Sequence, residues 1–351
     1  MTILTMDGFD SPLTPDDVLF QDSIWTFRGT AASIQAGGGR WGGQALRVTG
    51  SNGEGLRSGN LNTSNGIDFR AGSQLGVRLH FLFNGLLGAT NRVIRLSYSP
   101  STSTAYELAT VSIASDGSVT LYTSGVDPEI FPVGTIVEGG YYYLALDVQG
   151  ESSGGAADGW IKVRLNGTTV TLNDQTFAST STYLHIGLDI DSTELLVDDV
   201  VVADHHMTDL VPHRIHSLAP NADRAQADFI PLSGTDGFAM VDEQPHDGDT
   251  SYVVASTVGD TSEYEYAALG TSLGIYALKF HAVAKRDTSG TNDARHELRL
   301  STGTVLAGAD QPLLDDTYRF DKSGVLEQNP DTASAFTETE VNGLYSRHEV
   351  I

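Results

Sequence analysis

The sequence predicts a mostly β protein, in which an N-terminal jelly-roll sandwich is followed by a second, smaller β-rich domain. Short runs of alternating apolar and polar residues recur along the chain, and this period is that of a strand with one buried face. Turn signals separate the runs at intervals typical of a sandwich. Residues 1–205 contain no pattern that favours an amphipathic helix. Two stacked antiparallel sheets would bury all of these one-sided strands together.

Three segments of the first domain show the strand pattern most clearly. In VRLHFLF (77–83) alternate residues are apolar, which predicts one face in the core. WIKVRLNGTTV (160–170) predicts a hairpin, because Asn166-Gly167 is a preferred two-residue turn. LLVDDVVVAD (195–204) is apolar on both parities, as expected of a strand that is covered on both faces.

The glycine-rich stretch GGGRWGGQALRV (37–48) indicates a tight loop that leads into a strand. Its glycines permit positive φ angles and close approach of another backbone. We expect Trp41 to be buried at a corner of the sandwich, where it would cap the packing between the sheets.

Taken together, these segments resemble a concanavalin A-like, laminin G-like jelly roll. More narrowly, they resemble such domains in structural proteins of tailed-bacteriophage virions, and a weaker likeness of this kind extends to SYVVAS and NPDTASAFTETEVNGL in the second half. The first resemblance covers roughly residues 5–205 and rests on an ordered set of segments: WTF, GRWGGQALRV, SDGSVTLY, YYYLALDV, WIKVRLNGTTV and VDDVVVAD.

The resemblance implies a lectin-like structural component of a phage virion, associated with the tail, baseplate or fibre, that is not an enzyme. Its expected partners are other virion structural proteins, further copies of itself in a homo-oligomer, and a host-surface glycan during host attachment. It would be assembled in the host cytoplasm and located on the virion, at the tail rather than the head. Two alternatives stay open: a head decoration or head-fibre protein, and a polysaccharide depolymerase.

A change of pattern marks the predicted domain organisation. Residues 206–222 break the strand rhythm and contain two prolines and three histidines, so we expect a linker. The predicted domains are therefore the jelly roll over 1–205 and a second β-rich domain over 223–351. In that second domain we expect a long strand over 274–285 and a short helix after Thr337, with Glu340 at capping-box spacing.

The composition excludes several classes of function. The chain has 351 residues, 40% of them hydrophobic, and its formal net charge is −25. Such a surface repels nucleic acid and anionic lipid, so neither is an expected partner. The absence of cysteine excludes disulfides, thiolate metal sites and a cysteine nucleophile. No apolar run approaches the length of a membrane span, and the N-terminus lacks the pattern of a signal peptide.

Asp189, Asp191 and Glu194 are the one carboxylate set that suggests catalysis. Glucanases that share the jelly-roll fold present a Glu-x-Asp-x-x-Glu pattern on one strand. Here the first position is an aspartate, and Ser192-Thr193 indicates a turn within the pattern. We therefore interpret the segment as an exposed acidic turn and expect no catalytic residues in the chain.

We expect no cofactor, although other carboxylates raise the question of calcium, because hard oxygen ligands abound in the chain. Alternation forces either Asp198 or Asp199 toward the interior, and hydrogen bonding to backbone at a bulge is the favoured explanation over calcium. The acidic run in the second domain lacks EF-hand spacing and is interpreted as a solvated turn; it contains Asp242, Glu243, Asp247 and Asp249.

The histidines and tyrosines are weaker candidates. The histidines near the linker lack a helical His-x-x-x-His spacing, so adventitious metal binding is favoured over a functional zinc site; they are His205, His206, His213 and His216. Alternation sends Tyr142 to one face and Tyr141 and Tyr143 to the other. The outward pair would be exposed, and would either stack on sugar rings or, as we favour, pack against another protein surface.

Overall fold

A computed structural model of the chain describes most of its residues. Trp41, Asp191 and His206, about which the sequence makes predictions, lie outside this part of the chain. The described ranges are 3–9, 25–28, 32–40, 43–48, 54–58, 72–83, 91–101, 104–123, 128–153, 156–175, 184–190, 194–205, 213–243, 247–270, 274–287, 292–313 and 316–351.

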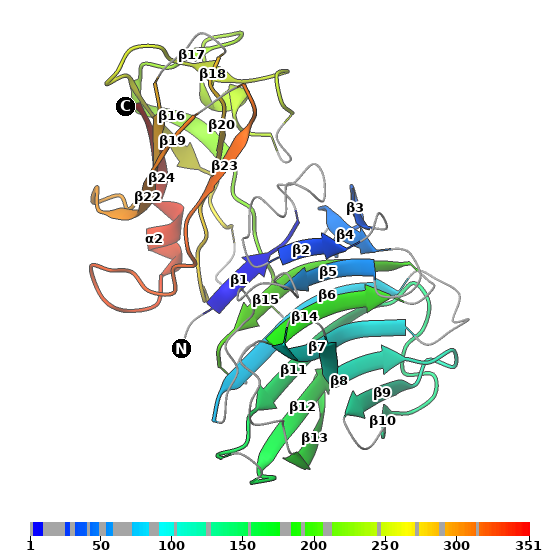
Figure 1. Ribbon diagram of the computed structural model, residues 1–351. Helices are drawn as coiled ribbons and strands as arrows, with labels where there is room; N and C mark the ends of the chain where they lie inside the picture. Colours follow the sequence, from blue (N-terminus) through cyan, green and yellow to red (C-terminus); the bar gives the residue numbers. More distant parts are fainter. Residues whose placement is uncertain are drawn as a thin grey trace. The chain divides into compact units, whose positions relative to one another are not determined.

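The described chain is built from β-strands in two compact units, as the fold prediction requires (Figure 1). The first unit ends at Ile215, and the second runs from His216 to Ile351. The finer boundaries of 206–222 for the linker stay a prediction. None of the described helices is long and apolar enough to cross a membrane.

The larger sheet of the first unit, sheet A, is antiparallel throughout and has the strand order β13-β12-β11-β6-β15-β4-β3, with β1 also paired to β15. Its strands are β13 (Thr168–Gln175), β12 (Gly159–Leu165), β11 (Tyr141–Gln149), β6 (Gln74–Phe83), β15 (Leu195–Ala203), β4 (Ala45–Val48), β3 (Ala32–Gln35) and β1 (Ile3–Asp7).

The second sheet of this unit, sheet B, has the order β10-β9-β8-β7-β14-β5-β2 and is also antiparallel. Its strands are β10 (Glu129–Phe131), β9 (Val119–Thr123), β8 (Thr104–Ile113), β7 (Asn91–Ser101), β14 (Leu184–Ile190), β5 (Glu54–Ser58) and β2 (Trp25–Arg28).

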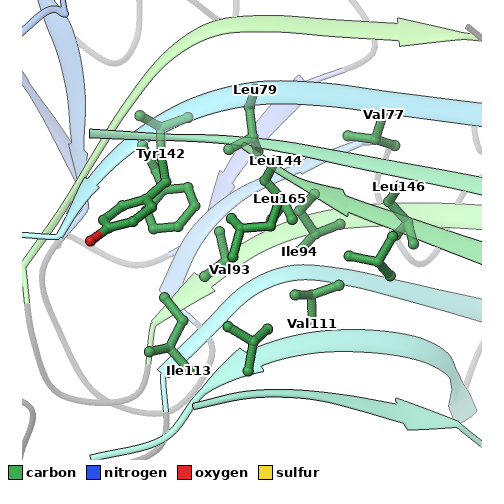
Figure 2. Packing of buried hydrophobic residues seen from close by; sticks show 14 of the residues in the cluster. Val77, Leu79, Val93, Ile94, Val111, Ile113, Tyr142, Leu144, Leu146 and Leu165 are labelled. Atoms are coloured by element: carbon green, nitrogen blue, oxygen red, sulfur yellow. The ribbon is translucent and has the colours of Figure 1, made fainter. Parts of the chain in front are cut away.

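One apolar core fills the space between the two sheets (Figure 2). Alternate residues of β6 and β11 enter it from sheet A, and residues of β7 and β8 enter it from sheet B, so the strand periodicity read from the sequence is confirmed. Tyr142 lies in this core and stacks on Phe81 at 5.4 Å between ring centroids. The labelled members in Figure 2 are Val77, Leu79, Val93, Ile94, Val111, Ile113, Tyr142, Leu144, Leu146 and Leu165.

The β12–β13 hairpin confirms the predicted turn. Asn166 and Gly167 have φ angles of 44° and 93°, the positive values that a two-residue hairpin turn needs. β12 itself alternates between buried and half-buried residues along its whole length. The outward row of the strand is therefore Trp160, Lys162 and Arg164.

Strand β15 is buried on both faces, as its sequence predicts, and it changes partner part-way along its length. Its first residues pair with β4, and its last residues pair with β1. Between the two pairings, the register with β6 shifts between Asp198 and Val201, and Asp199 has a φ of 52°. These features define a bulge at Asp198–Asp199.

The glycine-rich loop approaches this bulge closely. A Cβ atom on Gly39 would lie 2.6 Å from the Gln44 carbonyl oxygen and 3.1 Å from Asp198 Oδ2. The close approach that the glycines predict is therefore confirmed at this position.

The second unit contains a five-stranded antiparallel sheet, sheet C, in the order β16-β19-β24-β21-β22, and two small two-stranded sheets. Sheet C consists of β16 (Pro220–Ala227), β19 (Thr261–Tyr266), β24 (Tyr345–Val350), β21 (Ala294–Arg299) and β22 (Val305–Gln311). The small sheets pair β17 (Ile230–Pro231) with β18 (Val253–Val254) and β20 (His281–Ala284) with β23 (Arg319–Lys322). The helices in the described part of this unit are η1 (Phe238–Met240) and α2 (Glu338–Asn342).

Two local predictions for this unit have opposite outcomes. The helix after Thr337 is present, and both halves of its capping box with Glu340 are formed. The long strand over 274–285 is wrong, because only β20 at its end is a strand and Tyr276 is 48% exposed. Residues 274–280 have the alternating sequence pattern of a strand. Their only strand-like pairing in the described part of the chain is the isolated bridge between Leu278 and Leu326, so they do not form a sheet.

A histidine pair lies inside sheet C. His296 and His348 are register partners on β21 and β24, and their Nδ1 atoms are 2.7 Å apart. One Nδ1 must donate to the other, so the pair holds one proton between these atoms. Burial lowers the pKa of His296 to about 4, and burial followed by repulsion from His296 lowers the pKa of His348 well below its ordinary value.

The stability of the second unit should therefore fall in acid. The unfolded histidines titrate near 6.5, so stability is full above that pH and is lost as the pH falls toward about 4. His296 alone should account for a loss on the order of 3 kcal/mol. Urea unfolding of the full chain between pH about 7.5 and about 4.5 measures this loss. His296→Gln should reduce the pH dependence and His205→Gln should not; an unchanged pH dependence in His296→Gln would contradict the assignment.

Candidate functional site

The carboxylates Asp189 and Glu194 do not lie on one strand, as the glucanase pattern would require. Asp189 lies on β14 in sheet B, whereas Glu194 directly precedes β15 in sheet A. Glu194 Oε2 accepts a hydrogen bond from Arg47 Nε at 2.8 Å, within an ion pair with that guanidinium. Glu194 therefore lies apart from the strand that carries Asp189 and is held by a cation.

The bulge carboxylates bind backbone groups, as the sequence analysis favoured. Asp198 Oδ2 accepts a hydrogen bond from Arg40 N at 3.0 Å, and Asp198 Oδ1 accepts one from Asp199 N at 2.8 Å. Asp199 Oδ1 accepts one from Ile215 N at 2.7 Å. The two residues thus connect β15 to the loop before β4 and to the end of the first unit.

The acidic run of the second unit is engaged by protein groups. Asp247 Oδ1 accepts hydrogen bonds from the backbone and the hydroxyl of Ser251. Asp249 accepts one from the Tyr318 hydroxyl at 2.8 Å and forms an ion pair with Lys285. In the described ranges, no three His, Cys, Asp or Glu side chains are grouped as metal ligands would be.

The histidines near the linker have separate environments. His205 contacts the neighbouring Asp204 at 3.2 Å. His213 belongs to the first unit, where its Nε2 lies 2.7 Å from the Asp199 carbonyl oxygen. Because a carbonyl can only accept, Nε2 of His213 carries the proton.

The three consecutive tyrosines alternate as predicted, but one of the outward pair is not exposed. Tyr142 faces the core, whereas Tyr141 and Tyr143 face outward. Tyr141 is 36% exposed and its hydroxyl donates to the Gly38 carbonyl at 2.9 Å. Tyr143 is only 2% exposed, which corrects the expectation that both outward tyrosines would be exposed.

Tyr143 belongs to a group of polar side chains on the outer face of sheet A, the face opposite the core. We call Arg78, His80, Tyr143, Asp147 and Asp199 the outer-face cluster. Arg78 Nη2 and Asp147 Oδ1 are 2.6 Å apart, in an ion pair whose partners are almost fully buried. Arg78 also donates to the Val77 and Leu146 carbonyls.

His80 lies at the centre of the cluster. It is the register partner of Tyr143, and the two ring centroids are 5.1 Å apart. His80 Nδ1 is 3.2 Å from Asp199 Oδ2, close enough for an ion pair although the two are not aligned as a hydrogen bond. The His213 ring lies 5.6 Å from His80 and 5.9 Å from Tyr143. The cluster therefore combines a cation, two carboxylates and proton-carrying rings on adjacent strands.

The surroundings shift the proton affinities of the rings. Burial raises the pKa of Tyr143, although Arg78 and Arg164 oppose this shift. Burial lowers the pKa of His213 to about 4 against the opposing attraction of Asp199. Perturbed titrating groups gathered on one face are typical of functional sites, although structural ion-pair networks produce them as well.

Beside the cluster, the same face is open to solvent. The outward row of β12 is half-buried, and Lys162 Nζ lies 4.8 Å from the centre of the Trp160 ring. Arg164 Nε donates to Thr169 Oγ1 at 3.2 Å. The outer face therefore has a closed part on β6, β11 and β15, and an open part on β12 and β13.

The alternation of the tyrosines and the bulge could be predicted from the sequence, whereas the grouping of Arg78, His80 and Asp147 in one site could not. Arg78 and His80 lie on the face opposite the core, as the alternation of residues 77–83 predicts. The alternation of a strand does not show whether a second layer covers the outer side of its sheet.

No family model matches the chain, and no curated protein matches it by sequence. Among solved structures, an alginate lyase from a Chlorella virus is similar at 8% identity and a TM-score of 0.41, covering 58% of this chain and all of the lyase. A second alginate lyase, of polysaccharide lyase family 7, is 12% identical over 55% of this chain and 99% of its own, with a TM-score of 0.36. The globular domain of T. cruzi calreticulin is 15% identical over 58% of this chain and 89% of its own, with a TM-score of 0.38.

These similarities correct one prediction and leave others untouched. The prediction that the chain is not an enzyme is contradicted, since the similar structures include lyases. None of the structures named above is a tailed-phage virion protein, and the predicted place on a virion stays a prediction. Because identities are below 25% and TM-scores below 0.5, we take neither a substrate nor a catalytic residue for this chain from them.

Breaking the buried ion pair of the cluster should destabilise the first unit strongly. Arg78→Met leaves the Asp147 carboxylate buried without its cation, which should cost about 3–5 kcal/mol of unfolding free energy. The double variant Arg78→Met/Asp147→Leu should recover most of this loss. Denaturant unfolding measures both.

The matched control is Arg47→Met, which breaks the ion pair with Glu194. Arg47 is 41% exposed in that pair, so the loss should stay below about 1 kcal/mol. If Arg78→Met lowers the unfolding free energy no more than Arg47→Met does, the buried ion pair of the outer-face cluster is no more important to stability than an exposed one.

Proposed function

We propose that this protein is a polysaccharide depolymerase that engages its substrate on the outer face of sheet A. The observation that carries the proposal is the pairing of His80 with Tyr143, two proton-carrying rings on adjacent central strands, next to the Arg78 cation. Cleavage of a glycosidic bond needs one group to remove a proton and another to supply one. His80 and Tyr143 are two groups of the kind that can exchange protons with a ligand.

The open part of the same face provides room for a long ligand. Trp160 offers an aromatic surface of the kind on which sugar rings stack, and the exposed Thr169 and Thr171 offer hydroxyl groups for hydrogen bonding. These residues lie on the two strands next to β11, which carries Tyr143. A polymer held there would lie beside the cluster that carries the proton-transfer groups.

The outer-face cluster is buried, so the proposed reaction requires a conformational change that admits substrate. Arg78, His80 and Tyr143 are 1%, 0% and 2% exposed, so substrate reaches them only after a change that uncovers the face. His213 is a side chain that contributes to the closure, since its ring lies near both His80 and Tyr143. Loop motions that complete or open a catalytic site are common in enzymes.

The place of this activity is a separate proposal. The sequence resemblance supports a component of a phage particle, at the tail rather than the head, where a depolymerase would act on the host-surface glycan. Partner virion proteins and a homo-oligomeric state belong to the same proposal. Mass spectrometry of purified particles, with labelling of the particle by antibodies to this chain, tests it.

Incubation of the full-length protein with a panel of neutral and charged polysaccharides tests the activity. We expect polymer chains to shorten and new chain ends to appear. Tyr143→Phe removes the hydroxyl and should slow cleavage at least about 100-fold, the usual contribution of a proton-transfer group.

Tyr141→Phe is the matched control, because it removes a hydroxyl from the same strand and face outside the cluster. It should leave cleavage within about twofold of the wild-type rate, well below the effect expected at a proton-transfer group. Binding without new chain ends, or equal loss in both variants, would overturn the depolymerase proposal.

A further inference from the structure

The outward row of β12 has a charge that contrasts with the rest of the molecule. Trp160, Lys162 and Arg164 occupy alternate positions of one strand, so neighbouring side chains of the row lie about 7 Å apart on the same face. The chain as a whole carries a net charge of −25. Two cations in one half-buried outward row therefore place positive charge on an otherwise acidic molecule.

The register shows why the charge of Lys162 is not cancelled by the carboxylate beside it. Asp147 lies directly across from Lys162 on β11, but its carboxylate is buried and bound to Arg78 at 2.6 Å. On the other side, Lys162 faces the exposed Thr171. Among the residues that the structure describes, Lys162 forms no ion pair, and its ammonium group lies over the Trp160 ring.

We propose that the β12 row binds an anionic polysaccharide, a sugar polymer that carries carboxylate or sulfate groups. This inference rests on the proposed function and names its substrate class. Each component of such a polymer has a matching group on β12 or β13: Trp160 for sugar rings, Thr169 and Thr171 for hydroxyls, and Lys162 and Arg164 for anionic groups.

The overall charge of the chain argues for this class over nucleic acid. A duplex carries dense phosphate charge along its whole length and would be repelled by the acidic surface around a row of only two cations. A polysaccharide has uncharged ring and hydroxyl surface between its anionic groups, which suits a row that interleaves cations with an aromatic ring and hydroxyls.

Binding of the full-length protein to four polymers tests the inference: polygalacturonate for carboxylate, dextran sulfate for sulfate, unmodified dextran as the neutral sugar polymer, and duplex DNA as the non-sugar polyanion. We expect one or both anionic polysaccharides to bind more tightly than dextran and DNA. Added salt should weaken that binding.

The double variant Lys162→Gln/Arg164→Gln should weaken anionic polysaccharide binding about tenfold, the effect of losing two charge contacts at the surface. Lys279→Gln/Arg286→Gln removes the same charge from the second unit and is the matched control. Trp160→Ala should weaken the binding of every sugar polymer that the wild type binds. Circular dichroism of each variant establishes that it is folded.

The outcomes separate this inference from the proposed function. If dextran binds as tightly as the anionic polysaccharides and Lys162→Gln/Arg164→Gln changes nothing, the charge assignment is overturned while polysaccharide binding stands. If DNA binds as tightly as the anionic polysaccharides, or if both charge variants weaken binding equally, the row is a general polyanion surface and the inference is overturned. If no polysaccharide binds, both proposals fail.

Discussion

The bulge at Asp198–Asp199 is the constraint on which the organisation of the first unit depends. An extra residue in a central strand leaves backbone groups unpaired and turns side chains out of the regular alternation. Here it lets β15 pair with β4 before the bulge and with β1 after it. The displaced carboxylates bind Arg40 N and Ile215 N, so one irregularity joins the glycine-rich loop, the sheet and the end of the unit. Asp199 also lies within ion-pair distance of His80, which extends the effect of the bulge to the outer-face cluster.

Sheet A consequently has two different buried layers. Its inner face packs an apolar core, which releases water from nonpolar surface and favours folding without directional demands. Its outer face buries charged and polar groups, which is tolerated only because they bind one another: Arg78 binds Asp147, and Asp199 binds backbone. Buried ion pairs of this kind are weak sources of stability. Their presence is better explained by a use for the groups themselves, and the proposed acid–base role of His80 and Tyr143 supplies one.

The two units differ in how they hold titrating groups. In the first unit His213 lies among a cation, a carboxylate and aromatic rings, whereas in the second His296 and His348 bond directly to each other inside sheet C. Burial lowers the pKa in both places, so acid should weaken both units, but only the first carries the grouping of cation, carboxylate and proton-carrying rings that suits chemistry on a ligand. For this reason we assign the proposed function to the first unit, the sandwich, and not to the second.

The sequence by itself determined the strands that form the core of the sandwich, the Asn166-Gly167 turn, the capped helix after Thr337 and the burial of Tyr142 in the core. Each of these depends on local backbone preference or on the two-residue period of a strand. It also indicated that Asp198–Asp199 would bind backbone at a bulge. It could not show that Tyr143 is buried, that Asp189 and Glu194 belong to different sheets, or that residues before His281 leave the strand conformation. Those outcomes were decided by tertiary structure, since alternation assigns a side chain to a face of a sheet but does not state what lies against that face.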